Sequence, residues 1–240
     1  MKVTQTTAFL NGLVLDVQNG LLLPAAFQRP YVWGKPEVLA LVESLLREYP
    51  LGGMLLWSPE DKSSFKQYQR SRLGPCQASE PQAHASLLLD GQNRLATLAW
   101  LTRDPATPLP EDLTEQERIT WADGQELVAD LAAKVVRYVA AEDVDKGFFL
   151  PVNALFDSRI ANRIIRIRWS TTWAGIAEAE REDGLRWLDK ASYAVSNAKV
   201  IETNLSRASL QEAKHAFMHI CKVGVPMSEE DFEAALAWAS

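Results

Sequence analysis

The sequence is organised around residues 87–98, which read LLLDGQNRLATL. Three leucines run directly into an acid, a glycine, two amides and an arginine, and apolar residues at helical spacing follow. This order predicts a strand, a tight turn and the start of a helix. Backbone N–H groups at a helix N-terminus, beside a cation and a carboxylate, suit an anionic ligand. A capped turn with Arg94 in a structural ion pair fits the same pattern, so this segment alone leaves both interpretations open.

A second segment, residues 24–33, reads PAAFQRPYVW and couples another arginine to an amide. Its two prolines keep the backbone extended, so Gln28 and Arg29 are presented between aromatic residues. Two guanidinium groups brought together need an anion between them, and their planar forks match phosphate oxygens. The carboxylate of the first segment would then suit a metal-bridged phosphate or an attacking water. Tyr31 and Trp33 suit stacking on a base, although core packing is the commoner role of such residues.

The composition is that of a globular chain with a sizeable core. It has 240 residues, of which 47% are hydrophobic, and a net charge of -6. That charge argues against a surface devoted to nucleic acid but is compatible with a local basic patch. Cys76 and Cys221 form no CxxC pair, so we expect a reducing, cytoplasmic setting and no disulfide scaffold. Neither a signal peptide nor a membrane-spanning apolar run is evident, and no membrane partner is expected.

Before residue 90, the pattern predicts a short helix or strand near the N-terminus, a helix from Pro36 and a buried strand over residues 52–57. Residues 58–85 form a polar connector containing Lys66, Arg70 and Arg72. This connector could act as a lid, as a nucleic-acid contact or simply as a solvated surface loop.

Beyond residue 104, a proline-rich stretch is the best internal boundary, and Thr114 with Glu117 predicts a capping box. Strands are expected over 126–129, 148–152 and 199–204, and helices over 132–141, within 154–197, and over 211–221. A last helix is expected from Ser228 through Trp238.

A run of arginines on the helix expected after residue 154 is a candidate DNA-binding face. The run comprises Arg159, Arg163, Arg166 and Arg168. The acidic residues of segment 178–183 lie close by in sequence and could neutralise it. Phosphate binding and structural pairing both remain open.

Several common catalytic signatures are absent from the sequence: a P-loop, a GxGxxG turn, an HExxH helix and a GxSxG elbow. His215 and His219 are four residues apart with Cys221 nearby, but no further ligand follows. We therefore expect these histidines to lie on a helix surface.

The two segments together resemble the N-terminal domain family of GmrSD-type restriction endonucleases. Its hallmarks are a Pro-x-x-Gln-Arg-x-Tyr-x-Trp stretch, present here with one extra residue after Pro24, and an Asp-Gly-Gln-(Gln/Asn)-Arg-Leu motif, intact from Asp90 to Leu95. A weaker likeness covers residues 217–228, where Cys221 stands at the position of the family's Asn. That substitution leaves open what the position does here.

The resemblance implies an α+β fold with a ParB/sulfiredoxin-like core, a mixed sheet and additional helices toward the C-terminus. Residues 1–104 would form the core with both motifs, and residues 105–240 a mainly helical remainder of the same domain. It also implies binding of a nucleoside triphosphate, GTP among the candidates, with Mg²⁺, and in some members its hydrolysis while modified or foreign DNA is sensed.

The resemblance also implies roles for the residues at the matching motif positions. The catalytic candidates are Asp90, which is also the metal candidate, Gln92 and Arg94. The nucleotide-binding candidates are Gln28, Arg29, Tyr31, Trp33, Gly91 and Asn93.

The expected partners are a nucleotide, DNA and a separate nuclease chain, and a homo-oligomer is compatible with the sequence. The chain ends at Ser240 and shows no HNH-like pattern, so cleavage is expected to come from a partner. The alternative is a catalytically silent module that binds DNA or protein with the same fold.

Overall fold

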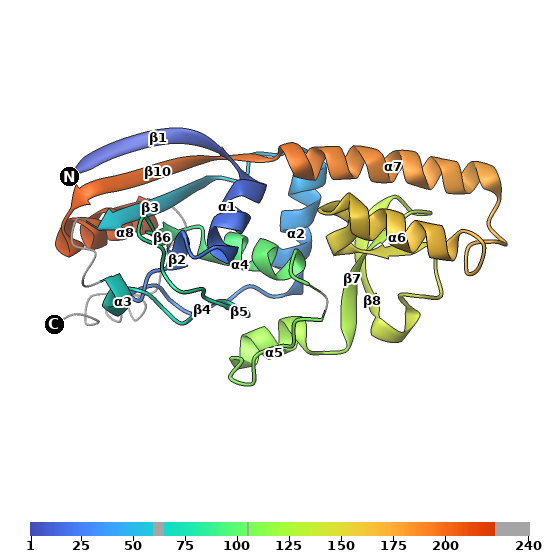
Figure 1. Cartoon of the computed structure of the whole chain (residues 1–240), viewed down its shortest axis with the longest axis horizontal. Coiled ribbons are helices and arrows are strands. Elements are labelled where there is room, and N and C mark those ends of the chain that lie inside the picture. Colours follow the sequence, from blue (N-terminus) through green and yellow to red (C-terminus); the bar gives the residue numbers. More distant parts are fainter. Residues whose placement is uncertain (60–64, 105, 224–240) are drawn as a thin grey trace. The chain divides into compact units, whose positions relative to one another are not determined.

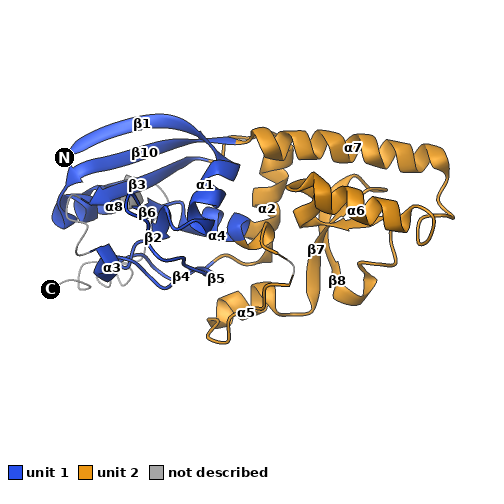
Figure 2. Ribbon diagram, viewed as in Figure 1, with its two compact units in different colours: residues 1–32, 52–99, 199–240 blue, residues 33–51, 100–198 orange. Residues whose placement is uncertain are grey.

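The computed structural model describes residues 1–59, 65–104 and 106–223, with the backbone alone at 221–223. The structure is α+β with a mixed sheet (Figure 1). Its contacts divide the chain into two compact units (Figure 2): unit 1 holds residues 1–32, 52–99 and 199–240, and unit 2 holds residues 33–51 and 100–198. None of the helices in the described residues has the length and apolar character to cross a membrane.

Unit 1 is built on a five-stranded sheet with the order β1-β10-β3-β6-β2. β3 runs parallel to β10 and antiparallel to β6, while β2 runs parallel to β6. The elements of this unit are β1 (Lys2–Phe9), α1 (Leu10–Gln18), β2 (Leu22–Pro24), β3 (Gly53–Pro59), α3 (Phe65–Tyr68), β4 (Arg72–Leu73), β5 (Cys76–Gln77), β6 (Ser86–Asp90), β10 (Lys199–Ala208) and α8 (Leu210–Val223). Helix α4 (Gln92–Leu101) has all but its last two residues in unit 1.

Strands β3 and β6 of this sheet are apolar runs because both of their faces are covered. Leu87, Leu88 and Leu89 of β6 have no exposed surface, and β3 contributes four consecutive buried residues beginning at Met54. Trp57 of β3 donates its indole N–H to the carbonyl of Ala208, 3.0 Å away. The predicted strand, turn and helix of residues 87–98 are therefore confirmed.

Unit 2 combines a three-stranded antiparallel sheet, ordered β8-β7-β9, with four α-helices among its described residues. Its elements are α2 (Lys35–Leu46), α5 (Glu115–Trp121), β7 (Gln125–Asp130), β8 (Val135–Ala140), β9 (Phe149–Pro151), the 3₁₀ turns η1 (Ala141–Asp143) and η2 (Val152–Leu155), α6 (Ser158–Arg168) and α7 (Glu178–Asn197). The predicted capping box opens α5, because Thr114 accepts from the N–H of Glu117 and Glu117 accepts from the N–H of Thr114.

One predicted element is wrong: the helix expected over residues 132–141 is a β-hairpin arm, β8. The Asp130 carboxylate accepts the N–H groups of Ala132 and Ala133, and Lys134 takes a positive φ of 58°, which closes a turn. The residues that follow include three valines and a tyrosine, which favour a strand. Pairing with β7 then decides the conformation.

The C-terminal expectations fall partly outside the described residues, which exclude the helix expected from Ser228 through Trp238 and the side chain of Cys221. His215 and His219 lie on α8 with exposed side chains. The division at residue 104 stays a prediction. The two compact units have other bounds, because the chain returns to unit 1 after α7, where β10 lies between β1 and β3.

Candidate functional site

The turn between β6 and α4 carries most of the predicted site residues. Gly91 has a φ of 94°, which L side chains rarely adopt, and a Cβ there would lie 2.0 Å from the Met54 sulfur. Asp90 pairs with Leu55 across a register shift in the β3–β6 ladder. A bulge of this kind re-aims side chains at a strand end. The glycine and the bulge together fix how Asp90 and the first turn of α4 are presented.

The Arg94 guanidinium is held against the entry of β3. Its Nη2 donates to the carbonyl of Gly53 at 2.7 Å and lies 3.5 Å from the Asp90 carboxylate. Gly52, with a φ of 78°, leaves space for it, because a Cβ there would approach Nη1 to 2.7 Å. Burial lowers the pKa of Arg94 below its ordinary value, and the charge of Asp90 opposes that shift. The structural ion pair considered from the sequence is therefore present.

Two hydrogen bonds join the two sequence motifs inside unit 1. The Gln92 amide donates to the backbone carbonyl of Arg29 at 3.0 Å. The Asn93 side-chain oxygen accepts the N–H of Val32 at 3.3 Å. The extended segment of the first motif therefore lies against the N-terminal turn of α4, which brings Gln28, Arg29 and Gln92 into one region.

Arg70, in the connector before β6, supports the backbone of the first motif through hydrogen bonds. It donates to the carbonyls of Ala26 and Gln28, and burial lowers its pKa. The backbone N–H of Arg70 also donates to the carbonyl of Pro24 at 2.8 Å. The sequence left this arginine in a lid, a nucleic-acid contact or a surface loop. The signal available was its position in a basic stretch, two residues after Tyr68, and that signal does not separate a supporting role from an exposed one.

Two amide oxygens in this region are buried without a hydrogen-bond partner: Oε1 of Gln28 and Oε1 of Gln92. Gln28 has only 4% of its surface exposed. A buried acceptor left unpaired costs about 1–3 kcal/mol, so such groups are commonly satisfied by water or a ligand. Both oxygens come from the two motifs, which makes the region a candidate ligand site.

The remaining nucleotide-binding candidates differ in their surroundings. Tyr31 is buried, and its hydroxyl shares a 2.8 Å hydrogen bond with Thr97 of α4, so its ring packs in the core of unit 1. Trp33 belongs to unit 2, where its carbonyl accepts from Thr120 at 2.9 Å. Arg29 is exposed.

The predicted basic face separates into two kinds of arginine. Arg159, Arg163 and Arg166 are exposed on α6, with Arg159 paired to Asp157 at 2.8 Å. Arg168 is buried instead, and it donates to the carbonyls of Val144 and Phe149 and to Asp145. Its role within unit 2 is to hold the loop before β9.

The pairing that was considered for this face, with the acidic segment 178–183, does not occur among the described residues. Asp183 pairs with Lys134 and Arg186, and Glu182 pairs with Arg186. Among the residues that the structure describes, neither Arg163 nor Arg166 has an ion-pair partner. The charge of these two exposed residues is therefore not offset by an ion pair.

The motif region fits a magnesium ion only together with a phosphate ligand. The described residues contain no group of three or more His, Cys, Asp or Glu side chains that could hold a metal by themselves. Mg²⁺ is commonly held by one or two carboxylates plus the phosphates of its nucleotide, and the Asp90 carboxyl, with 42% of its side chain exposed, suits that arrangement.

These features define an α+β protein with a candidate ligand site at a strand–turn–helix segment, which a second, arginine-bearing segment contacts. The sequence matches the family model of the GmrSD restriction endonuclease N-terminal domain over residues 10–237, nearly the whole chain. The chain belongs to this family, as its two motifs indicated. No curated protein matches the sequence.

Proposed function

We propose that this protein is a cytoplasmic component of a restriction system against foreign DNA, and that its unit 1 binds a nucleoside triphosphate with Mg²⁺. The observation that carries the proposal is the contact between the two motifs, with two buried amide oxygens left without partners. Family membership supports the restriction role, and a ParB/sulfiredoxin-like core is part of the same proposal.

The residues of unit 1 would contact different parts of the nucleotide, according to their chemistry. Arg94 and Arg29 are suited to phosphate oxygens, because a guanidinium presents several donors in one plane. The partial burial of Arg94 strengthens that attraction, since low-polarity surroundings screen charge poorly. The unpartnered oxygens of Gln28 and Gln92 can accept N–H or O–H groups of the ligand or of its ordered water.

Asp90 is the candidate for orienting metal and water. A bound Mg²⁺ would supply charge neutralisation at the phosphates. The carboxylate of Asp90 would orient the water that attacks, if the site turns the nucleotide over. Modified or foreign DNA and a separate nuclease chain are the proposed partners of this unit, and GTP is the first nucleotide to test.

The test is a calorimetric titration of GTP and ATP with Mg²⁺, paired with phosphate release in the presence and absence of DNA. Asp90→Ala and Arg94→Ala should weaken binding by about ten- to a hundredfold, the cost of one charged hydrogen-bonding group. Arg47→Ala, at an exposed position after α2, is the matched control and should bind as wild type does. Wild-type protein that binds neither nucleotide would exclude the proposal.

A second candidate function is DNA or protein binding by α6 without turnover. The supporting observation is the pair of exposed arginines, Arg163 and Arg166, with no ion-pair partner among the described residues. Contacts to phosphates release counterions, so affinity for duplex DNA should fall linearly with the logarithm of salt concentration. Arg163→Glu with Arg166→Glu should abolish most of that binding, and unchanged DNA affinity would eliminate this candidate.

A further inference from the structure

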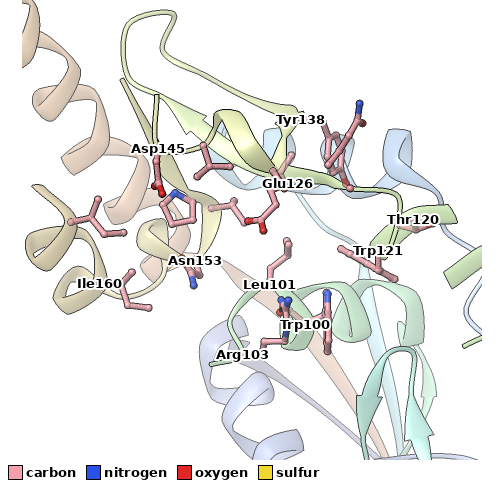
Figure 3. Close-up of a pocket in the computed structure, with 18 of the residues that line it drawn as sticks. Trp100, Leu101, Arg103, Thr120, Trp121, Glu126, Tyr138, Asp145, Asn153 and Ile160 are labelled. Atoms are coloured by element: carbon pink, nitrogen blue, oxygen red, sulfur yellow. Dashed lines mark hydrogen bonds between the residues drawn. The ribbon is translucent and has the colours of Figure 1, made fainter. Parts of the chain in front are cut away.

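Unit 2 contains a cavity of about 460 Å³ that the proposed function does not use (Figure 3). Ligand pockets commonly measure about 300–1,000 Å³, so this one has room for a small molecule. Its walls come from the end of α4, from α5, β7 and β8, from the loop before β9, from η2 and from α6. All of its lining residues belong to unit 2.

One wall of the cavity is aromatic. The rings of Trp100 and Trp121 meet edge to face with their centroids 6.4 Å apart. The Arg103 guanidinium stacks on the Trp100 ring at 3.5 Å, and Figure 3 shows both side chains on the same side of the cavity. Trp100 itself has only 3% of its surface exposed, so the half-buried side chains of Arg103 and Trp121 are the ones that can offer a flat face to a planar heterocycle.

Two polar atoms at this cavity are buried without hydrogen-bond partners: Oδ1 of Asn153 and the hydroxyl of Tyr138. Burial, reinforced by the charge of Asp123, raises the pKa of Tyr138, so the phenol stays neutral and keeps its donor proton. The cavity therefore combines an unpaired carboxamide oxygen with an unpaired hydroxyl. Figure 3 shows the two side chains at different ends of the cavity, so a ligand would meet them separately, and the amino group of a nucleobase can donate to the carboxamide oxygen.

The charged groups around the cavity suit an attached phosphate at one end. Arg168 is already paired with Asp145, so these two charges offset one another. Arg163 adds a positive charge from α6, and Arg103 adds another beside the indole of Trp100. Glu126, on β7, is the remaining acid that lines the cavity, and its carboxylate can accept a hydrogen bond from the amino group of a base.

We propose that this cavity is a second nucleotide site, in which the base stacks on Arg103 and Trp121 against Asn153 and the phosphate faces Arg163. The shared chemistry is a nucleotide with one phosphate at its 5′ side, and it has two sources. It is either a free nucleoside monophosphate or a nucleotide extruded from a strand, as enzymes acting on bases extrude their targets.

The experiment uses the full chain carrying Arg94→Ala, so that the site of unit 1 is weakened and the two proposals fail independently. Free nucleoside 5′-monophosphates and a short duplex with one unpaired 2-aminopurine are titrated separately. Quenching of tryptophan fluorescence and the 2-aminopurine signal report the two sources. We expect saturable binding of one or both probes.

The variants then locate the binding. Asn153→Ala and Arg163→Gln should each weaken it by about tenfold, comparable to the loss of one hydrogen bond to the base or to the phosphate. The matched control is Arg166→Gln, since Arg166 is exposed on the same helix but does not line the cavity, and its affinity should equal that of the parent.

Two results would overturn the assignment. One is the failure of both probes to bind. The other is an equal loss in Arg166→Gln and Arg163→Gln with none in Asn153→Ala, which would mean that the helix attracts phosphate without the cavity. Circular dichroism of each variant separates loss of binding from loss of structure.

Discussion

Replacing Gly91 by alanine tests whether the site depends on the strained turn between β6 and α4. Gly91 has a φ of 94°, and a Cβ at this position would lie 2.0 Å from the sulfur of Met54, a buried residue of β3. A left-handed conformation costs a non-glycine residue about 1–2 kcal/mol, and overpacking a core about 1–3 kcal/mol. Gly91→Ala should therefore lower the free energy of unfolding by about 2–5 kcal/mol.

The assay is a urea titration followed by circular dichroism, with a thermal melt beside it. For a chain of this size, the expected loss lowers Tm by about 5–15 °C. Hydrogen exchange of peptides covering β6 and α4 should rise in the same variant, because the turn fixes both elements. Gly12→Ala is the control: it lies within α1, and a Cβ there would have no heavy atom within 4 Å, so it should be neutral or stabilise by about 0.5–1 kcal/mol.

A double variant separates the two causes. In a Met54→Ala background the sulfur is gone, so Gly91→Ala should lose its packing component and keep only the backbone component. A Gly91→Ala protein that unfolds at the wild-type midpoint would refute this reasoning. An equal cost in both backgrounds would refute the packing component alone.

Three further outcomes are expected. Arg70→Met removes a charged donor from the carbonyls beside the first motif and should destabilise the chain by about 2–3 kcal/mol in urea titrations, with weaker nucleotide binding. Thr114→Ala removes the N-cap of α5 and should cost about 1 kcal/mol in the same titration. Glu202→Gln should stabilise at pH 7, measured by Tm across pH, because burial, and secondarily the charge of Asp16, raises the pKa of Glu202 in the folded chain.

The sign of the Glu202 effect follows from proton linkage. A raised carboxyl pKa means that the folded state holds the proton more tightly, so stability is lost as pH rises from the ordinary value of 4.5 through the folded pKa. The gain from Glu202→Gln should therefore shrink as the pH is lowered to that value. Exposed Glu43→Gln is the control, and an equal gain at both ends of the range would contradict this explanation.

The controls for Thr114→Ala and Arg70→Met are exposed residues of the same type elsewhere in the chain. Thr172→Ala, at an exposed position outside the helices, should leave stability unchanged, whereas an equal loss there would remove the capping explanation. Arg47→Met, also exposed, should be neutral. An Arg70→Met protein as stable as wild type would show that the carbonyls beside the first motif do not depend on this arginine.

The sequence by itself determined the local features and the family. Apolar residues running into Asp90 and Gly91 predicted the strand and helix there, because period and turn chemistry are local properties. The capping box at Thr114 was readable for the same reason. Two short motifs were sufficient to indicate the family that the chain belongs to.

Tertiary structure alone decided which residues meet. Residues 132–141 form a strand arm because β7 offers a pairing edge and Asp130 closes the turn, and neither is visible in a local helical pattern. Arg70 supports the first motif, and Arg168 is buried. In both cases hydrogen bonds to backbone carbonyls far away in the sequence outweigh the preference of arginine for solvent. Contacts between residues far apart in sequence depend on how the whole chain packs. For that reason the hydrogen bond from Gln92 to the Arg29 carbonyl, and the cavity beside Asn153, could be seen only in the folded protein.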